Sequence, residues 1–204
     1  MKTISCMNID KDLLYSFGAE NKIYKKKESV FKEGDHVVYF FQIAKGKVKL
    51  NNYSEEGKEF IHNILGKNQS FGDALLFLNQ YYPMNAICLE ESEIIRITKD
   101  NFMEMIRKNP KLSLEMNTCF SQEIFYKLKM MQSMASENPI QRLKGVLDYL
   151  KSYHDGDCTH CFPIEFTRQQ IANLVGLRVE TVIRALKKME KEGSIAFKER
   201  KILY

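Results

Sequence analysis

The sequence lacks the features of several common protein classes. No apolar run among its 204 residues is long enough to span a bilayer, which takes about 20 residues. The first residues, Met1 to Asp10, lack the apolar core of a secretory signal. The five cysteines are odd in number and irregularly spaced, which argues against a disulfide framework. We therefore expect a cytoplasmic protein with reduced thiols and no membrane partner.

Catalytic patterns are also missing. No nucleophile–base pair or carboxylate dyad occurs in a context that would make it catalytic. A thiol–disulfide enzyme built on Cys158-Thr-His-Cys161 is conceivable, but the motif lacks the βαβ context that such enzymes need. We expect a protein that is not an enzyme.

What the sequence does contain is typical of a soluble globular protein, with 44% apolar and 28% charged residues. Its formal net charge is +5, and the excess gathers near one end. Residues 163–204 hold nine Lys or Arg and five Glu, a difference of +4. A basic excess of this kind fits a nucleic-acid partner, although by itself it is weak evidence.

Residues 166–188 carry the pattern of two short helices joined at Gly176. Thr167 and Gln170, three residues apart, form a capping-box pattern for the first helix. Gly176 stands where a helix stop and tight turn need a positive φ angle. The apolar residues recur at helical spacing and are expected to be buried: Ile171, Leu174, Val175, Val182, Leu186 and Met189.

The other side of the second helix carries Glu180, Arg184 and Lys187, spaced to lie along one face. This pattern predicts a helix-turn-helix whose polar helix can enter a DNA major groove. An ordinary helical hairpin with a solvated charged face is the alternative. The coincidence of capping box, turn glycine and basic helix favours the first interpretation.

The rest of the chain changes character along its length. Up to about Lys27 we expect a short helix and linker, and from Val30 to about Thr98 an all-β sandwich or barrel with glycine-bearing turns. The clearest expected strands are 38–43, 47–50, 60–64 and 93–97, with a hairpin turn at 54–58. Helices are expected over 99–107, 111–134 and 140–153, and two short strands over 193–204.

The helix over 111–134 carries one continuous apolar stripe with a spacing of three or four residues. Its members are Leu112, Met116, Phe120, Ile124, Leu128, Met131 and Met134. The stripe could pack against the chain's own β domain. Its length and methionine content favour a helix-to-helix homodimer seam formed by Met116, Phe120, Ile124, Leu128 and Met131.

This order of β domain, long helix and winged helix-turn-helix resembles the Crp/Fnr family of bacterial transcription regulators. The resemblance covers nearly the whole chain and is strongest over 167–184 and in Ser70-Phe-Gly-Asp-Ala-Leu-Leu-Phe77. It implies an α+β fold in three parts. Residues 1–108 would form a jelly-roll-like double-stranded β-helix similar to cyclic-nucleotide-binding domains. Residues 109–136 would form a dimerisation helix and hinge, and 137–204 a winged helix-turn-helix.

By the same resemblance, the protein would bind double-stranded DNA as a homodimer on an inverted repeat, with RNA polymerase as a partner if it is an activator. Arg184 would bond a guanine edge through O6 and N7, and Glu180 would accept from a base amino group or hold Arg184 in place. Arg178 replaces the usual Ser or Thr cap, and Val179 looks more like the Fnr branch. The implied DNA-binding set is Thr167, Arg168, Gln169, Arg178, Val179, Glu180, Thr181, Arg184 and Lys187.

The resemblance weakens at the effector pocket. Members that bind cyclic AMP use Gly-Glu and Arg-Ser-Ala, where this chain has Gly72-Asp73 and Met84-Asn85-Ala86. Loss of the phosphate-pairing Arg costs about 3–5 kcal/mol, or at least about two powers of ten in affinity. We expect an unknown effector other than cyclic AMP, although a cyclic-nucleotide-binding module remains an alternative. The degenerate pocket comprises Phe71, Gly72, Asp73, Ala74, Met84, Asn85 and Ala86.

No cofactor is expected. Only Cys6 lies in the N-terminal region, so the cysteine group of an iron–sulfur cluster is absent, and haem at His36 or His62 is a minor alternative. Cys158 and Cys161 have the spacing of a metal knuckle or dithiol switch. A polar loop with incidental thiols is the favoured interpretation, and redox or metal sensing is the alternative.

Overall fold

The computed structural model describes residues 7–57, 59–78, 80–152, 162–164, 166–199 and 201–204. The chain divides into two compact units, which meet between Phe120 and Ser121. That boundary falls inside helix α3 (Pro110–Met134), within the segment 109–136 that the sequence assigns to the connection.

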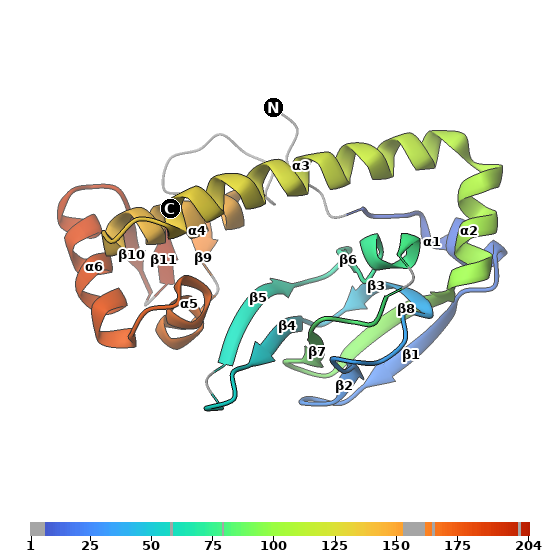
Figure 1. Cartoon of the computed structure of the whole chain (residues 1–204), viewed down its shortest axis with the longest axis horizontal. Coiled ribbons are helices and arrows are strands. Elements are labelled where there is room, and N and C mark those ends of the chain that lie inside the picture. The colour runs from blue at the N-terminus through green and yellow to red at the C-terminus, as the bar shows by residue number, and fades with distance from the viewer. Residues whose placement is uncertain (1–6, 58, 79, 153–161, 165, 200) are drawn as a thin grey trace. The chain divides into compact units, whose positions relative to one another are not determined.

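The first unit is built on two antiparallel four-stranded sheets (Figure 1). One sheet has the order β1 (Glu20–Tyr24), β8 (Ser92–Thr98), β3 (Tyr39–Lys45) and β6 (Ser70–Phe71). The other has the order β2 (Ser29–Phe31), β7 (Asn85–Cys88), β4 (Val48–Tyr53) and β5 (Glu59–Leu65). This arrangement confirms the predicted jelly-roll-like β domain.

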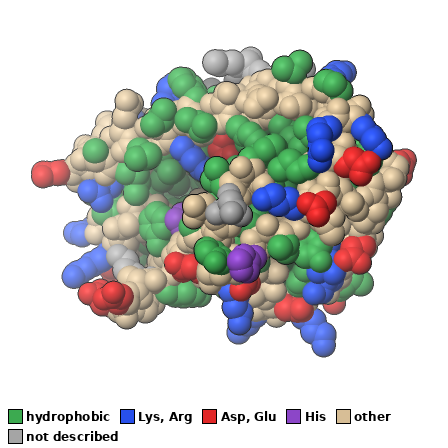
Figure 2. Space-filling model, turned by 45° about the vertical axis from the view of Figure 1, so that its right-hand side comes forward, with side chains coloured by type: hydrophobic (Ala, Val, Ile, Leu, Met, Phe, Trp, Pro, Cys, Tyr) green, Lys and Arg blue, Asp and Glu red, His purple; other side chains and the backbone are tan. Residues whose placement is uncertain are grey.

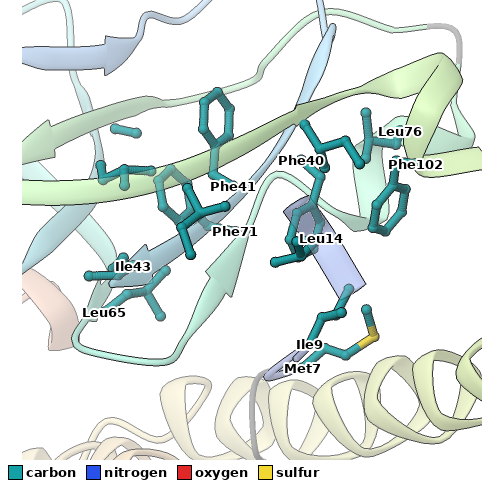
Figure 3. Packing of buried hydrophobic residues seen from close by; sticks show 14 of the residues in the cluster. Met7, Ile9, Leu14, Phe40, Phe41, Ile43, Leu65, Phe71, Leu76 and Phe102 are labelled. Carbon is teal, nitrogen blue, oxygen red and sulfur yellow. The ribbon is translucent and has the colours of Figure 1, made fainter. Parts of the chain in front are cut away.

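Aromatic side chains join the two sheets through a shared core. Phe41 of β3 and Phe71 of β6 stack with ring centroids 5.1 Å apart (Figure 3). Phe31 of β2, from the other sheet, lies 5.8 Å from Phe41. Such contacts contribute area burial and ring–ring attraction together, so they fix the spacing of the sheets as well as stabilising them.

Helices cover the outer face of the first sheet, which explains the long apolar run in β3. Phe40 stacks on Phe102 of α2 (Lys99–Lys108) at 4.5 Å, and Leu14 of α1 (Lys11–Ser16) is fully buried beside them (Figure 3). Gln42 is also fully buried, and its amide bonds the N–H and the carbonyl of Ile9, each at 2.9 Å. A strand buried on both faces reads as a continuous rather than alternating run.

The sequence prediction was wrong over residues 20–24, where strand β1 replaces the expected linker. β1 is an edge strand in which only Tyr24 is buried, and Ile23 is 68% exposed. The alternation that marks a half-buried strand is therefore absent. Strands β2, β6 and β7 were also missed, because each has only two to four residues.

Two glycines occupy turns with a positive φ angle, which other residues rarely adopt. Gly46 has φ +98°, and a Cβ there would lie 2.3 Å from the hydroxyl of Ser92. Gly57 has φ +77° and donates to the carbonyl of Ser54 at 2.8 Å, which closes the turn between β4 and β5. The predicted hairpin at 54–58 is thus confirmed for its described residues.

The apolar stripe of α3 is divided between two environments. Leu112 and Met116 are buried in the core of the first unit, which corrects the expectation that Met116 belongs to a dimer seam. Ile124, Leu128 and Met131 are 59%, 56% and 63% exposed. Hydrophobic side chains that remain at the surface form patches among charged ones in Figure 2.

The second unit contains the predicted winged helix-turn-helix. After α4 (Pro139–Lys151) come β9 (Pro163–Ile164), α5 (Arg168–Val175), α6 (Val179–Lys191), β10 (Ala196–Lys198) and β11 (Lys201–Leu203). The three strands form an antiparallel sheet in the order β10-β11-β9 (Figure 1). The sequence predicted two of these strands, whereas the two-residue β9 carries too little pattern to be recognised.

No helix among the described residues is long and apolar enough to cross a membrane.

Candidate nucleic-acid interface

The start of α5 is fixed by the capping box that the sequence predicts. The Thr167 hydroxyl accepts from the backbone N–H of Gln170 at 3.1 Å, and the Gln170 amide oxygen accepts from the N–H of Thr167 at 2.8 Å. α5 ends at Gly176, whose φ of +66° lies in the left-handed region. The two caps set both ends of a helix of eight residues, so the turn into α6 is defined by local chemistry.

α6 has one buried face and one open face. Val182, Leu186 and Met189 are buried, as predicted. Glu180, Arg184 and Lys187 are exposed, and none of the three forms an ion pair or side-chain hydrogen bond with the residues that the structure describes. The alternative in which Glu180 holds Arg184 is therefore not seen. A row of exposed, unpaired charges is suited to a polar ligand that approaches from outside.

The N-terminus of α6 is left without a side-chain cap. Arg178 is the cap residue and makes no capping hydrogen bond, as its chemistry predicts. Its backbone carbonyl instead accepts from the N–H groups of Thr181 and Val182, at 3.0 and 3.1 Å. The positive end of the helix and the exposed Arg178 side chain thus lie together, a combination that attracts anions.

Two side chains of α5 are held by contacts that the sequence analysis missed. Gln169 donates from Nε2 to Oδ1 of Asn173 at 2.9 Å, and Asn173 is buried. Arg168 is half-buried, with its guanidinium over the ring of Phe197 in β10. The spacing of Gln169 and Asn173 by four residues is a detectable signal, whereas the Arg168 contact depends on the tertiary fold.

The wing, which consists of strands β10 and β11, carries two like charges opposite each other. Lys198 of β10 and Lys201 of β11 are register partners, and both are exposed. Like charges directly opposite each other destabilise a strand pair. An anion bound near the wing would relieve this repulsion.

The predicted sensor pocket occupies the first unit, with its first group at β6 and the turn after it. Phe71 is buried, and Gly72 has φ +76° with Phe41 and Tyr82 3.4–3.5 Å from where its Cβ would be. Asp73 caps the short 3-10 helix Ala74–Phe77 by accepting from the N–H of Ala74 at 2.9 Å. Its other carboxylate oxygen accepts from the Ser70 hydroxyl, also at 2.9 Å.

The second group of the pocket lies on and just before β7. Asn85 accepts from the N–H of Glu33 and donates to the carbonyl of Asn51, both at 3.1 Å. Met84 packs against the apolar core, and Ala86 is fully buried. The polar side chains at both ends of the pocket are thus bonded within the chain.

The aromatic cluster connects the two groups. Tyr82 stacks on Phe31 with ring centroids 3.6 Å apart, and its ring also borders Gly72. Burial raises the pKa of the Tyr82 hydroxyl, which donates to the carbonyl of Tyr39 at 3.3 Å. Phe31 is also the register partner of Ala86 in β7, so both parts of the predicted pocket border one aromatic cluster.

Comparison with known proteins assigns both units. Residues 21–109 match the model of the cyclic nucleotide-binding domain, and residues 141–204 match that of the Crp-like helix-turn-helix domain. The chain belongs to the Crp/Fnr family. It is a transcription regulator of the Crp/Fnr type, as the resemblance at the sequence level implied.

Individual Crp/Fnr proteins are similar over most of the chain. The "Anaerobic regulatory protein" of Pasteurella multocida (strain Pm70) is 29% identical over 190 residues, covering 91% of this chain and 68% of that protein. The "cAMP-activated global transcriptional regulator CRP" of Haemophilus influenzae (strain ATCC 51907 / DSM 11121 / KW20 / Rd) is 26% identical over 179 residues, covering 84% and 78%. The solved structure of FixK2 from Bradyrhizobium japonicum shares the fold, with a TM-score of 0.73, 18% identity and 91% coverage of each chain.

The residues considered for haem or metal binding in this Crp/Fnr chain have other contacts. The ring of His62 bonds the side-chain oxygen of Asn52, and the ring of His36 packs on Tyr81 at 4.6 Å. The described residues contain no cluster of three or more His, Cys, Asp or Glu that could hold a metal ion. Cys6, Cys158 and Cys161 lie outside the described residues, so the predictions about them stand as predictions.

Proposed function

We propose that this Crp/Fnr-type regulator binds DNA in a sequence-specific manner, as a homodimer on an inverted repeat. The observation that carries the proposal is the open face of α6. Glu180, Arg184 and Lys187 are exposed and form no ion pair with the described residues, while the opposite face is buried against the rest of the unit. A helix held on one face and charged on the other matches the geometry of a recognition helix in a major groove.

In this proposal, the side chains of α6 read bases and those around it contact phosphates. Arg184 bonds O6 and N7 of a guanine, and Glu180, one turn earlier, accepts from the amino group of a cytosine. Val179 and Thr181, at the start of α6, face the bases near its N-terminus. The remaining contacts, to the DNA backbone and to the DNA beside the contacted bases, come from Thr167, Arg168, Gln169, Arg178 and Lys187.

The dimer seam is proposed to run along the exposed part of α3. Ile124, Leu128 and Met131 lie three or four residues apart, so they form one stripe, and each leaves more than half of its surface in water. Packing two such stripes against each other would remove this apolar area from solvent. A two-fold axis would then place two copies of α6 about 34 Å apart, one turn of DNA.

Cyclic AMP is proposed not to be the effector of this regulator. Met84 cannot pair a buried phosphate, and the amide of Asn85 is already bonded to backbone groups at both its oxygen and its nitrogen. Asp73 is likewise bonded to Ser70 and Ala74. An entering phosphate would compete with these bonds, and neither Met84 nor Asn85 would offer it a cation.

A mobility-shift titration on inverted-repeat DNA at several salt concentrations tests the proposal. We expect one specific sequence to bind with a steep decrease in affinity as salt rises, since each phosphate contact adds about 0.9 to the slope of log affinity against log salt. Absence of DNA binding under all salt conditions would contradict it. If the protein is an activator, RNA polymerase is a further partner.

A further inference from the structure

A contact between a cation and an aromatic ring links the wing to the helix-turn-helix. The guanidinium carbon of Arg168, the first residue of α5, lies 5.1 Å from the centroid of the Phe197 ring in β10. A guanidinium within about 6 Å of a ring centroid is attracted to the negative face of the ring. The contact therefore has a favourable geometry.

The Phe197 ring is itself held by the small sheet. Phe197 is the register partner of Ile202 in β11, and Ile202 is the partner of Ile164 in β9. Cross-strand partners share a face of the sheet, and both isoleucines are buried. Phe197 is therefore the half-buried edge of an apolar face that packs into the unit, so the direction of its ring is set by the core.

Contact with the ring restricts where the Arg168 guanidinium can lie. Its N–H donors lie in the plane of the group, at its edge. Arg168 also directly follows Thr167, the cap of α5, so it lies at the positive end of that helix. A guanidinium fixed in this place is suited to a phosphate, since less side-chain entropy is lost on binding.

We propose that Phe197 is a positioning residue for DNA binding. It holds Arg168 so that the N–H edge of the guanidinium meets a phosphate of the DNA backbone beside the groove that α6 enters. This inference rests on the proposed DNA-binding function and adds a role for a wing residue that carries no charge itself. Because a phosphate contact carries no sequence information, its loss weakens specific and non-specific binding alike.

The contact can be tested without DNA. The δ-methylene protons of Arg168 should show an upfield ring-current shift in the proton NMR spectrum of the free protein. The shift should persist in Phe197→Tyr, which keeps the ring, and disappear in Phe197→Leu, which keeps an apolar side chain of similar size. A wild-type spectrum without the shift would overturn the inference even if the protein binds DNA well.

The consequence is tested by fluorescence anisotropy with operator DNA over a range of salt concentrations. Phe197→Leu should weaken binding about two- to fivefold per subunit and reduce the salt slope by up to about 0.9 per subunit. Arg168→Ala should reduce the slope similarly, and the double variant should add little, because both changes remove one contact. Phe197→Tyr is the matched control and should bind as the wild type does.

Two outcomes separate this inference from the function on which it rests. If the wild type binds operator and Phe197→Leu keeps the full salt slope, or if the effects of Phe197→Leu and Arg168→Ala simply add, the positioning role is contradicted while DNA binding stands. Circular-dichroism melting curves for each variant check that the fold is retained. If Phe197→Leu unfolds, the pair Phe197→Tyr and Phe197→Met replaces it, with Met expected to lose the slope and Tyr to keep it.

Discussion

The polar side chains on the outer face of α6 and those in the predicted pocket of the β domain differ in their bonding. On α6, Arg184 and Lys187 are exposed and form no ion pair with the described residues. In the β domain, Asn85 and Asp73 each bond two groups of the chain itself. Open charges are available to a ligand from outside, whereas bonded polar groups must first be freed.

This difference separates the two halves of the regulator in functional terms. A binding site for a buried anion normally contains a cation, because an uncompensated buried charge is costly. The wing accepts some repulsion between Lys198 and Lys201 in the free protein, as a surface intended for phosphate would. At the β7 side of the pocket, Met84 and Asn85 supply no cation. The comparison therefore predicts a regulator that binds DNA and does not use cyclic AMP as its effector.

The largest expected effect comes from breaking the proposed dimer. Leu128→Glu places a charge in the middle of the exposed stripe of α3, and two such charges would face each other across the seam. We expect a monomer by analytical ultracentrifugation and a loss of operator affinity of about 100-fold or more, because bivalent binding is lost. Lys129→Glu changes an exposed residue that is not three or four residues from any member of the stripe, so as the control it should remain dimeric.

An unchanged dimer in Leu128→Glu, or an equal loss in Lys129→Glu, would contradict the seam. Either result would leave the exposed stripe without a partner in the proposal.

Removing the charge of Arg184 tests the proposed recognition face of α6 directly. Arg184→Ala should cost about 1–3 kcal/mol at each half-site and relax the preference at the contacted base pair. Lys191→Ala removes the same charge from the far end of α6 and should leave sequence preference unchanged. Binding to a library of single-base operator variants measures both effects. Equal preference profiles for wild type and Arg184→Ala would exclude Arg184 from base recognition.

The prediction about the pocket is tested with cyclic AMP, first on the wild type and then on a variant that regains the residues of cyclic-AMP-binding members. Cyclic AMP should not raise the melting temperature of the wild type, since a ligand stabilises a protein only by binding its native state. The variant Asp73→Glu with Met84→Arg restores the carboxylate length and the phosphate partner, and it should gain a measurable shift. Thermal scans with and without cyclic AMP decide this. A shift in the melting temperature of the wild type would contradict the prediction, because it would show that the wild type binds cyclic AMP.

The smallest effect concerns a structural contact of the second unit, where Tyr204 donates to a carboxylate oxygen of Asp148 at 2.5 Å. Tyr204→Phe should lose about 1 kcal/mol of unfolding free energy near neutral pH. Burial raises the pKa of Tyr204, and the bond to Asp148 raises it further. The folded state then holds the phenol proton more tightly than the unfolded state does.

The stabilisation from Tyr204 is therefore complete below the unfolded pKa of about 10 and decreases as the pH rises above it. Urea unfolding of wild type and Tyr204→Phe between about pH 8 and about pH 11 measures this. The difference between the two proteins should narrow toward high pH. A difference that grows with pH would reverse the sign and contradict the assignment.

Local chemistry made the second unit predictable from sequence. The capping box of Thr167 and Gln170, the turn at Gly176 and the buried positions Val182, Leu186 and Met189 are all set within a few residues of one another. Features that depend on distant residues escaped prediction. The edge strand β1 is defined only by its pairing with β8, and the Arg168–Phe197 contact only by the tertiary fold.

The apolar stripe of α3 shows where periodicity stops being informative. A period of three to four residues identifies an apolar face, and it does not say which surface covers that face. In the structure, Met116 is covered by the chain's own core, whereas Leu128 is 56% exposed. Only the three-dimensional arrangement separates these two parts of one continuous pattern.

Selection of binding sites from random DNA, followed by affinity measurements with and without cyclic AMP, tests the central claim most directly. The account predicts a two-fold symmetric site with half-sites about one helical turn apart. It also predicts the same affinity for that site whether or not cyclic AMP is present. Failure to enrich any sequence would contradict the role of α6 in base recognition. DNA binding that requires cyclic AMP would contradict the proposal that cyclic AMP is not the effector.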